Sequence, residues 1–201
     1  MKNRVITISR EFGSGGRTIG KRVAEKLGIP CYDAEIIEKM AKETGFAPDY
    51  VKEAGEYAPG SFLSSAFSNR MLGPTNEDIL WEHQYKVITD LAAKGPCIIV
   101  GRCADLVLTG QNVDCLSLFI CAPFEWRVHH RMELENLDEK AARALVEKTD
   151  AQREKYYTHY TGRPWGLPEN YDICINSARL GIDRTAALLA EHCRELFSNP
   201  C

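Results

Sequence analysis

The sequence predicts an α/β fold: a three-layer sandwich in which helices cover both faces of a parallel sheet of about five strands. Two observations support this prediction. Short apolar runs, each the length of a buried strand, alternate along the chain with longer segments of helical period. The first of these runs, at 5–8, leads into a glycine cluster and then into a helical pattern, as in the opening unit of many such folds.

The predicted elements follow the apolar pattern in order. After the strand at 5–8 comes a helix marked by Ile19, Val23 and Leu27, four residues apart, which Gly28 ends. Further strands are expected at 97–100, 116–121 and 172–176. Further helices are expected at 34–44, 77–94, 124–135, 139–160 and 182–197. Thr75 or Asn76 is expected to cap the helix at 77–94, and Asp138 the helix at 139–160.

A chain of 201 residues fits one domain, 1–201. We expect an acceptor-binding or flap insertion around 34–76, because glycines and prolines interrupt 55–76 while large apolar residues recur there, unlike in a linker. A lid is expected around 148–165. With 25 Lys and Arg against 28 Asp and Glu, the net charge of −3 argues against a nucleic-acid binder.

No apolar run is long enough to span a membrane, and residues 1–6 lack the apolar core of a signal peptide, so a cytoplasmic protein is expected. None of the eight cysteines forms a Cys-x-x-Cys pair. We therefore expect small apolar side chains rather than metal ligands at Cys97, Cys115, Cys121 and Cys174. A homo-oligomer is possible on this sequence.

The loop 9–17, between the first strand and the first helix, is the best candidate for a phosphate-binding site. Its sequence, Ser-Arg-Glu-Phe-Gly-Ser-Gly-Gly-Arg, brings small residues to the N-terminus of a helix, where backbone N–H groups and the helix dipole favour an anion. The residues expected to bind the phosphates of ATP are Gly13, Ser14, Gly15, Gly16, Arg17 and Thr18. The fold is therefore expected to be of the P-loop type.

This loop departs from the standard P-loop pattern at two positions. Gly16 stands where a lysine is expected, and Arg10 stands where the first loop glycine is expected. Arg17 begins the helix and lies closest to the loop glycines, so we expect it, ahead of Lys21 and of Arg10 at the other end of the loop, to supply the missing charge. Thr18 is expected to place its hydroxyl on Mg²⁺.

Two further polar residues follow short apolar segments. Arg102 comes directly after the predicted strand 97–100 and should project into the crevice at the carboxyl end of the sheet, where a guanidinium suits a phosphate. Asp33 has two interpretations that remain open: it orients a magnesium-bound water or an acceptor hydroxyl, or it caps the helix at 34–44. Tyr156, Tyr157 and Trp165 are expected to pack beneath a lid rather than to stack on a base.

Taken in order, these segments resemble a known family. The stretch 6–27 aligns without gaps on the start of cytidylate kinases, and Val-Gly-Arg-Cys at 100–103 resembles the segment that binds the acceptor phosphate there. Together with Tyr-Tyr-x-x-Tyr-Thr-Gly at 156–162, the set is similar to the cytidylate-kinase-like family over nearly the whole chain.

The resemblance implies a kinase that moves the γ-phosphoryl group of ATP, with Mg²⁺, onto a nucleoside monophosphate of the CMP type or a similar small acceptor. It implies that the lid carries the charges of Lys148 and Arg153, and that Arg17 and Arg102 act in catalysis beside them. The absence of the loop lysine keeps a second hypothesis open: a nucleotide-binding sensor or interaction protein with little or no kinase activity.

Overall fold

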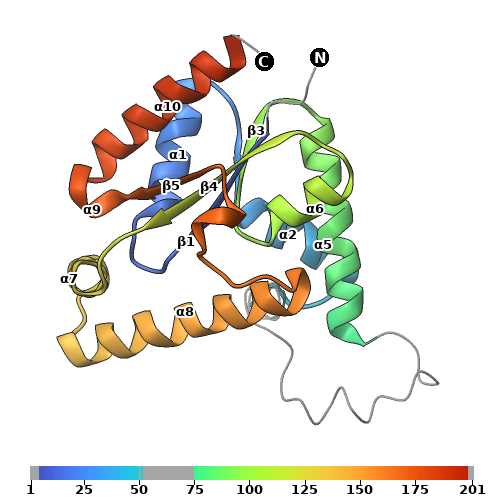
Figure 1. The fold of residues 1–201 in the computed structure, drawn as a ribbon. Helices are drawn as coiled ribbons and strands as arrows, with labels where there is room; N and C mark the ends of the chain where they lie inside the picture. Colours follow the sequence, from blue (N-terminus) through green and yellow to red (C-terminus); the bar gives the residue numbers. More distant parts are fainter. Residues whose placement is uncertain (1–4, 50, 52–74, 199–201) are drawn as a thin grey trace.

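The computed structural model describes residues 5–49, 51 and 75–198 (Figure 1). Its centre is a five-stranded sheet of order β2-β3-β1-β4-β5, in which every neighbouring pair is parallel. The strands are β1 (Val5–Arg10), β2 (Cys31–Tyr32), β3 (Cys97–Val100), β4 (Cys115–Cys121) and β5 (Ile173–Asn176). The predicted fold class and parallel sheet are confirmed.

The helices cover the two faces of the sheet and the edge at which its strands end. They are α1 (Gly16–Leu27), α2 (Ala34–Thr44), α5 (Asn76–Ala93), α6 (Ala104–Gly110), α7 (Phe124–Glu135), α8 (Glu139–Thr161), α9 (Ser177–Leu180) and α10 (Ile182–Ser198), with a 3-10 turn at Pro168–Asn170. α1 and α10 cover one face of the sheet, and α2, α5 and α6 cover the other. No described helix is both long enough and apolar enough to cross a membrane.

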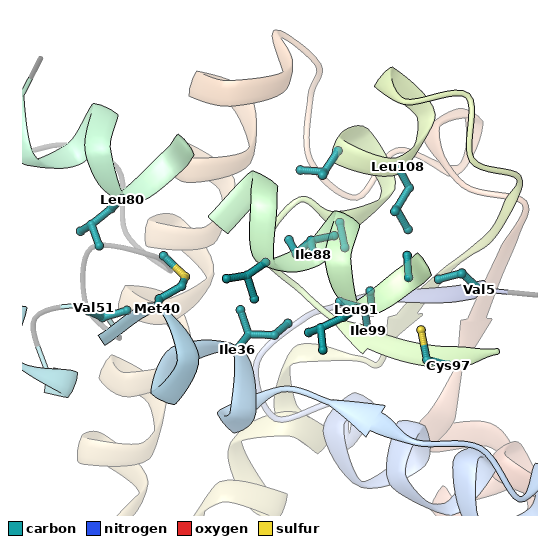
Figure 2. Close-up of a cluster of buried hydrophobic side chains, with 14 residues drawn as sticks. Val5, Ile36, Met40, Val51, Leu80, Ile88, Leu91, Cys97, Ile99 and Leu108 are labelled. Atoms are coloured by element: carbon teal, nitrogen blue, oxygen red, sulfur yellow. The ribbon is translucent and has the colours of Figure 1, made fainter. Parts of the chain in front are cut away.

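Alternate residues of the same strands supply the two cores. Ile6, Ile8 and Ile98 face α1 and α10, whereas Val5 and Ile99 face α2, α5 and α6. Figure 2 shows the second of these cores, in which side chains from both layers interlock. Burial on both faces explains the continuous apolar runs from which the strands were predicted.

Some short elements lie outside the sequence prediction. β1 continues past Ile8 to Arg10, because its pairing with β4 runs on to Ile120, so the loop is shorter than 9–17. β2, α6 and α9 were not predicted, since two, seven and four residues are too few for a clear period. Of the insertion expected around 34–76, the first part forms α2, and residues 52–74 lie outside the described part.

Candidate functional site

The loop between β1 and α1 forms a turn whose backbone only glycine adopts without strain. Gly13 and Gly15 have φ angles of +83° and +79°. No side chain of the described residues caps α1 at Gly15, whereas Thr75 and Asp138 cap α5 and α8 with hydrogen bonds. The N–H groups of the first turn of α1 are therefore available to an anion.

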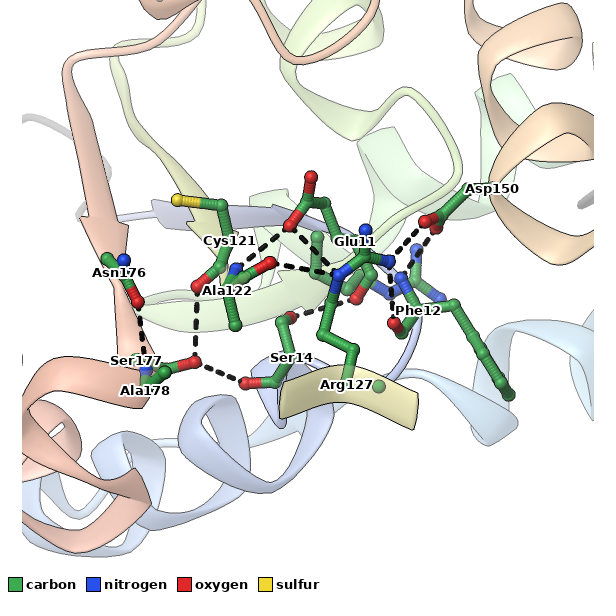
Figure 3. Close-up of polar contacts among 12 residues, drawn as sticks. Glu11, Phe12, Ser14, Cys121, Ala122, Arg127, Asp150, Asn176, Ser177 and Ala178 are labelled. Atoms are coloured by element: carbon green, nitrogen blue, oxygen red, sulfur yellow. Dashed lines mark hydrogen bonds and ion pairs between the residues drawn. The ribbon is translucent and has the colours of Figure 1, made fainter. Parts of the chain in front are cut away.

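A buried ion-pair network holds the other side of this loop (Figure 3). Arg127 on α7 forms an ion pair with Asp150 on α8, lies 3.4 Å from a carboxylate oxygen of Glu11, and donates a 3.0 Å hydrogen bond to the carbonyl oxygen of Phe12. Asp150 accepts a hydrogen bond of 2.7 Å from the N–H of Phe12, and Glu11 accepts one of 2.8 Å from Ala122. The network thus joins the loop to α7, α8 and the end of β4.

Two more side chains bind carbonyl groups of the loop. The buried hydroxyl of Ser177 lies 2.6 Å from the carbonyl oxygen of Ser14, and Nδ1 of His130 lies 2.7 Å from that of Gly13. These contacts hold the loop from outside, and within it the N–H group of Ser14 donates a 3.3 Å hydrogen bond to the carbonyl oxygen of Glu11. Figure 3 shows Ser177 and Ser14 beside the network.

Gly16 is closely covered by the side chain of Arg10. A Cβ atom added at Gly16 would lie 2.6 Å from Cβ of Arg10 and 3.3 Å from Cβ of Ile120. A Cβ atom added at Gly101 would overlap the terminal nitrogen of the same arginine. The Arg10 side chain therefore extends from the end of β1, past the first residue of α1, to the segment that follows β3.

That second segment, Gly101, Arg102 and Cys103, is a turn of left-handed backbone with φ angles of +73°, +62° and +50°. Such a conformation costs roughly 1–2 kcal/mol at each residue that is not glycine, and it persists only where surrounding contacts fix it. Here Gln84 on α5 fixes it, because its amide donates a 2.9 Å hydrogen bond to the carbonyl oxygen of Arg102. This left-handed turn places the Arg102 side chain at the end of β3.

Arg102 is 5% exposed, and its Nη2 atom has no hydrogen-bond partner among the described residues. Its Nη1 atom lies 3.5 Å from the carbonyl oxygen of Val51. A buried guanidinium with an unused donor is costly unless a negatively charged group binds it. The Arg102 guanidinium is therefore suited to an anionic group.

A pocket at the carboxyl ends of β1 and β3 brings three arginines together. Its lining includes Arg10, Arg102 and Arg153, with Tyr156, Tyr157 and Trp165. Arg153, on α8, donates a 3.2 Å hydrogen bond to the carbonyl oxygen of Arg10. The tyrosines belong to a buried aromatic cluster, as expected for packing, and burial raises the pKa of Tyr156 well above its usual value.

The other predicted site residues lie outside this pocket. Arg17 forms an ion pair with Asp33. The Asp33 side chain makes no capping hydrogen bond to α2. Thr18 is exposed in the first turn of α1, next to the loop. Lys148 is exposed on α8 and does not line the pocket. The structure thus brings together Arg102 and Arg153 with Arg10, a residue that the sequence prediction ranked below Arg17.

The first turn of α1 suits Mg²⁺ only in part. The Thr18 hydroxyl is an oxygen ligand beside the loop, and Mg²⁺ commonly takes one or two protein ligands and completes its shell with phosphate oxygens and water. Among the described residues no group of three or more His, Cys, Asp or Glu residues is placed to hold a metal. Cys97, Cys103 and Cys193 are buried free thiols, while Cys174, expected in the core, is exposed on the edge strand β5.

A buried carboxyl group lies behind the pocket. Asp105, on α6, accepts a 3.2 Å hydrogen bond from the hydroxyl of Tyr157, and burial raises the pKa of this carboxyl group above its usual range. Burial likewise raises the pKa of the Cys103 thiol, which keeps the thiol protonated at neutral pH.

Sequence reasoning missed the residues that hold the loop. Glu11, Arg127, Asp150 and Ser177 come from four separate segments, and no local pattern connects them. A signal in the sequence was that apolar residues flank Arg127, which indicates a buried position. A buried charged residue requires a partner of opposite charge.

Known proteins are similar to this chain in sequence. The model of the Cytidylate kinase-like family matches residues 5–179. A cytidylate kinase of Methanopyrus kandleri is 26% identical over 194 residues, which cover 92% of this chain and 90% of that protein. A cytidylate kinase of Pyrococcus horikoshii is 25% identical over 176 residues, 87% of this chain and 80% of its own.

Solved structures extend the likeness to the fold. An uncharacterized protein from Eubacterium ventriosum has a TM-score of 0.71 and 28% identity, with 94% of this chain and 98% of that chain covered. A shikimate kinase from Bacteroides thetaiotaomicron has a TM-score of 0.53 at 16% identity, with 94% and 97% covered. At that identity the second likeness concerns the fold alone.

Proposed function

The chain belongs to the cytidylate kinase-like family, and we propose that it is a kinase that transfers the γ-phosphoryl group of ATP to a nucleoside monophosphate of the CMP type or a similar small anionic acceptor. One observation carries the proposal most: an uncapped helix N-terminus and a pocket of three arginines adjoin each other at the carboxyl ends of β1 and β3. Ligands in parallel α/β sheets bind at this edge. Phosphoryl transfer needs little besides positioning and positive charge, and these residues are suited to both.

The donor phosphates are assigned to the loop and the first turn of α1. We assign to them the N–H groups of Gly13, Gly15 and Gly16, with Ser14 between them and its own N–H group bonded to Glu11. The α1 dipole favours the negative charge. Thr18 is the proposed protein ligand of Mg²⁺, which, when bound, would offset charge on the phosphate oxygens. The Arg127 network keeps the loop in this shape before any ligand arrives.

The acceptor is assigned to the pocket. Arg102 presents its unused Nη2 donor to the acceptor phosphate, and Arg153 lines the same pocket. Asp33, held by Arg17, is the candidate for orienting an acceptor hydroxyl. α8, which carries Arg153 and Lys148, is the proposed lid, because its closure over bound substrates would exclude water from the transfer.

A second function is favoured by one observation. Gly16 occupies the usual lysine position, and Arg10 leaves no room there for a longer side chain. If no other cation replaces that lysine, the chain would bind nucleotide without fast transfer, as a sensor does. For either function we propose a cytoplasmic location. The proposed partners are small nucleotides and, in a homo-oligomer, further copies of this chain.

Release of ADP, measured for each nucleoside monophosphate in turn with ATP and Mg²⁺, distinguishes the two functions. A kinase gives turnover above the ATP-only background with one acceptor class, and Arg102→Ala removes most of that turnover. Lys26→Ala, an exposed charge at the far end of α1, is the matched control and should retain it. ATP binding with no turnover on any acceptor would favour the sensor.

A further inference from the structure

We propose that Arg10 supplies the positive charge that the missing loop lysine would otherwise give, so that the cation of this site comes from the end of β1 instead of the start of α1. The inference rests on the proposed function and names a phosphate-contacting residue for it. It replaces the expectation that Arg17 has this role. The observations that carry it are the packing of Arg10 against two glycines and its position in the arginine pocket.

The first observation is that Gly16 and Arg10 occupy one space. In the standard P-loop pattern the lysine stands at the Gly16 position and a glycine stands at the Arg10 position. Here Cβ and Cγ of Arg10 would lie 2.6 and 3.1 Å from a Cβ atom at Gly16. The long cationic side chain and the glycine have thus exchanged places, and the glycine at position 16 leaves the space that the Arg10 side chain occupies.

The second observation concerns where the Arg10 side chain ends. Its terminal nitrogen lies against Gly101, which has a φ angle of +73° and no side chain to block it. Gly101 immediately precedes Arg102, the residue assigned to the acceptor. The Arg10 guanidinium therefore lies between the donor loop and the acceptor arginine, which is where a transferred phosphoryl group must pass.

The third observation is that the base of Arg10 is well fixed. Arg10 pairs with Ile120 in the register of β1 and β4, and its carbonyl oxygen accepts a hydrogen bond from Arg153. Arg17, by contrast, is an exposed residue whose guanidinium forms an ion pair with Asp33. A fixed guanidinium is pre-organised for the charge that develops during transfer, and less entropy is lost when it binds.

The chemistry requires such a cation. An oxygen of the acceptor phosphate forms a bond to the γ-phosphorus while the bond from that phosphorus to the bridging oxygen breaks. The electron pair of the broken bond leaves with ADP, and any proton on the attacking oxygen goes to solvent. Negative charge shifts toward the bridging oxygen, and a guanidinium nearby stabilises it through paired N–H donors.

Exchanging the two residues tests the inference. Arg10→Gly should lower kcat by about 10²–10³-fold, the usual loss when one such donor is removed, and should weaken ATP binding measured by calorimetry. Gly16→Lys alone should lower the melting temperature, because its Cβ atom meets Arg10 at 2.6 Å. The double variant, Arg10→Gly with Gly16→Lys, should recover at least about tenfold of the lost turnover and regain ATP affinity.

Three comparisons complete the design. Arg10→Gln keeps much of the side-chain volume without the charge and should show the same loss, so a folding defect in Arg10→Gly does not decide the outcome. Lys21→Ala, an exposed cation in the second turn of α1, should leave turnover unchanged. The inference is overturned if Arg17→Ala causes the large loss and the Arg10 variants do not, or if the double variant is no better than Arg10→Gly.

The calorimetry separates this inference from the proposed function. If the wild-type protein transfers phosphoryl groups to no acceptor, the proposed kinase activity fails, but ATP affinity still reports on Arg10. Loss of that affinity in Arg10→Gly and its return in the double variant would support the exchange even then. Unchanged affinity across all of these variants would contradict it.

Discussion

Replacing Arg127 with methionine should be among the most destabilising single changes in this protein. The side chain is 7% exposed and loses hydrogen bonds of 3.0 Å to the carbonyl groups of Ala122 and Phe12, together with its ion pair with Asp150. Removing one partner of a buried ion pair leaves the other charge buried, which costs about 3–5 kcal/mol. With a urea slope of about 2 kcal/mol/M, the unfolding midpoint should fall by about 1.5–2.5 M.

A matched arginine provides the control. Arg143, on α8, forms ion pairs with Glu125 and Glu139 at 2.8 and 2.9 Å, but this cluster is exposed to solvent. Arg143→Met should therefore move the midpoint only slightly, since exposed ion pairs contribute little. Urea unfolding of both variants measures the difference. If Arg127→Met shifts the midpoint by less than about 0.5 M, the network does not hold the loop as argued.

Two further predictions concern groups around the site. Ser177→Ala leaves the buried carbonyl group of Ser14 without its 2.6 Å hydrogen bond and should cost about 1–3 kcal/mol in urea unfolding; an unchanged midpoint would contradict this. Asp105 has a raised pKa in the folded state, so folding favours its protonated form and its contribution to stability is lost as the pH rises through that raised value. Asp105→Asn still accepts from Tyr157, so its stability relative to wild type should rise as the pH rises above the usual aspartate pKa of about 4. A difference independent of pH would refute the burial argument.

The elements that could be predicted are those encoded within a single segment. The apolar run of β1 and the glycine loop after it are local, as are the caps Thr75 and Asp138, and all are found in the structure. β2 could not be predicted, because its two residues become a strand only by pairing with Ile98 and Ile99 of β3. The same limit explains why Ser9 and Arg10 were assigned to the loop.

The site was predictable where position along a strand decides it. Arg102 lines the pocket because it lies in the turn that follows β3, and Arg153 lines it because α8 crosses the end of the sheet. The choice between Arg10 and Arg17 could not be made from sequence, since both flank the loop. It depends on packing, because Gly16 gives Arg10 its space while Asp33 pairs with Arg17.

The central claim is tested most directly by following the γ-phosphoryl group itself. ATP labelled at the γ-phosphate is incubated with the protein, Mg²⁺ and the best acceptor from the screen, and the products are separated. The account predicts that the label appears on the acceptor, and that Arg102→Ala, with ATP binding intact, nearly abolishes this transfer. Label that stays in ATP or appears only as inorganic phosphate with every nucleoside monophosphate, from protein that binds ATP, would contradict it.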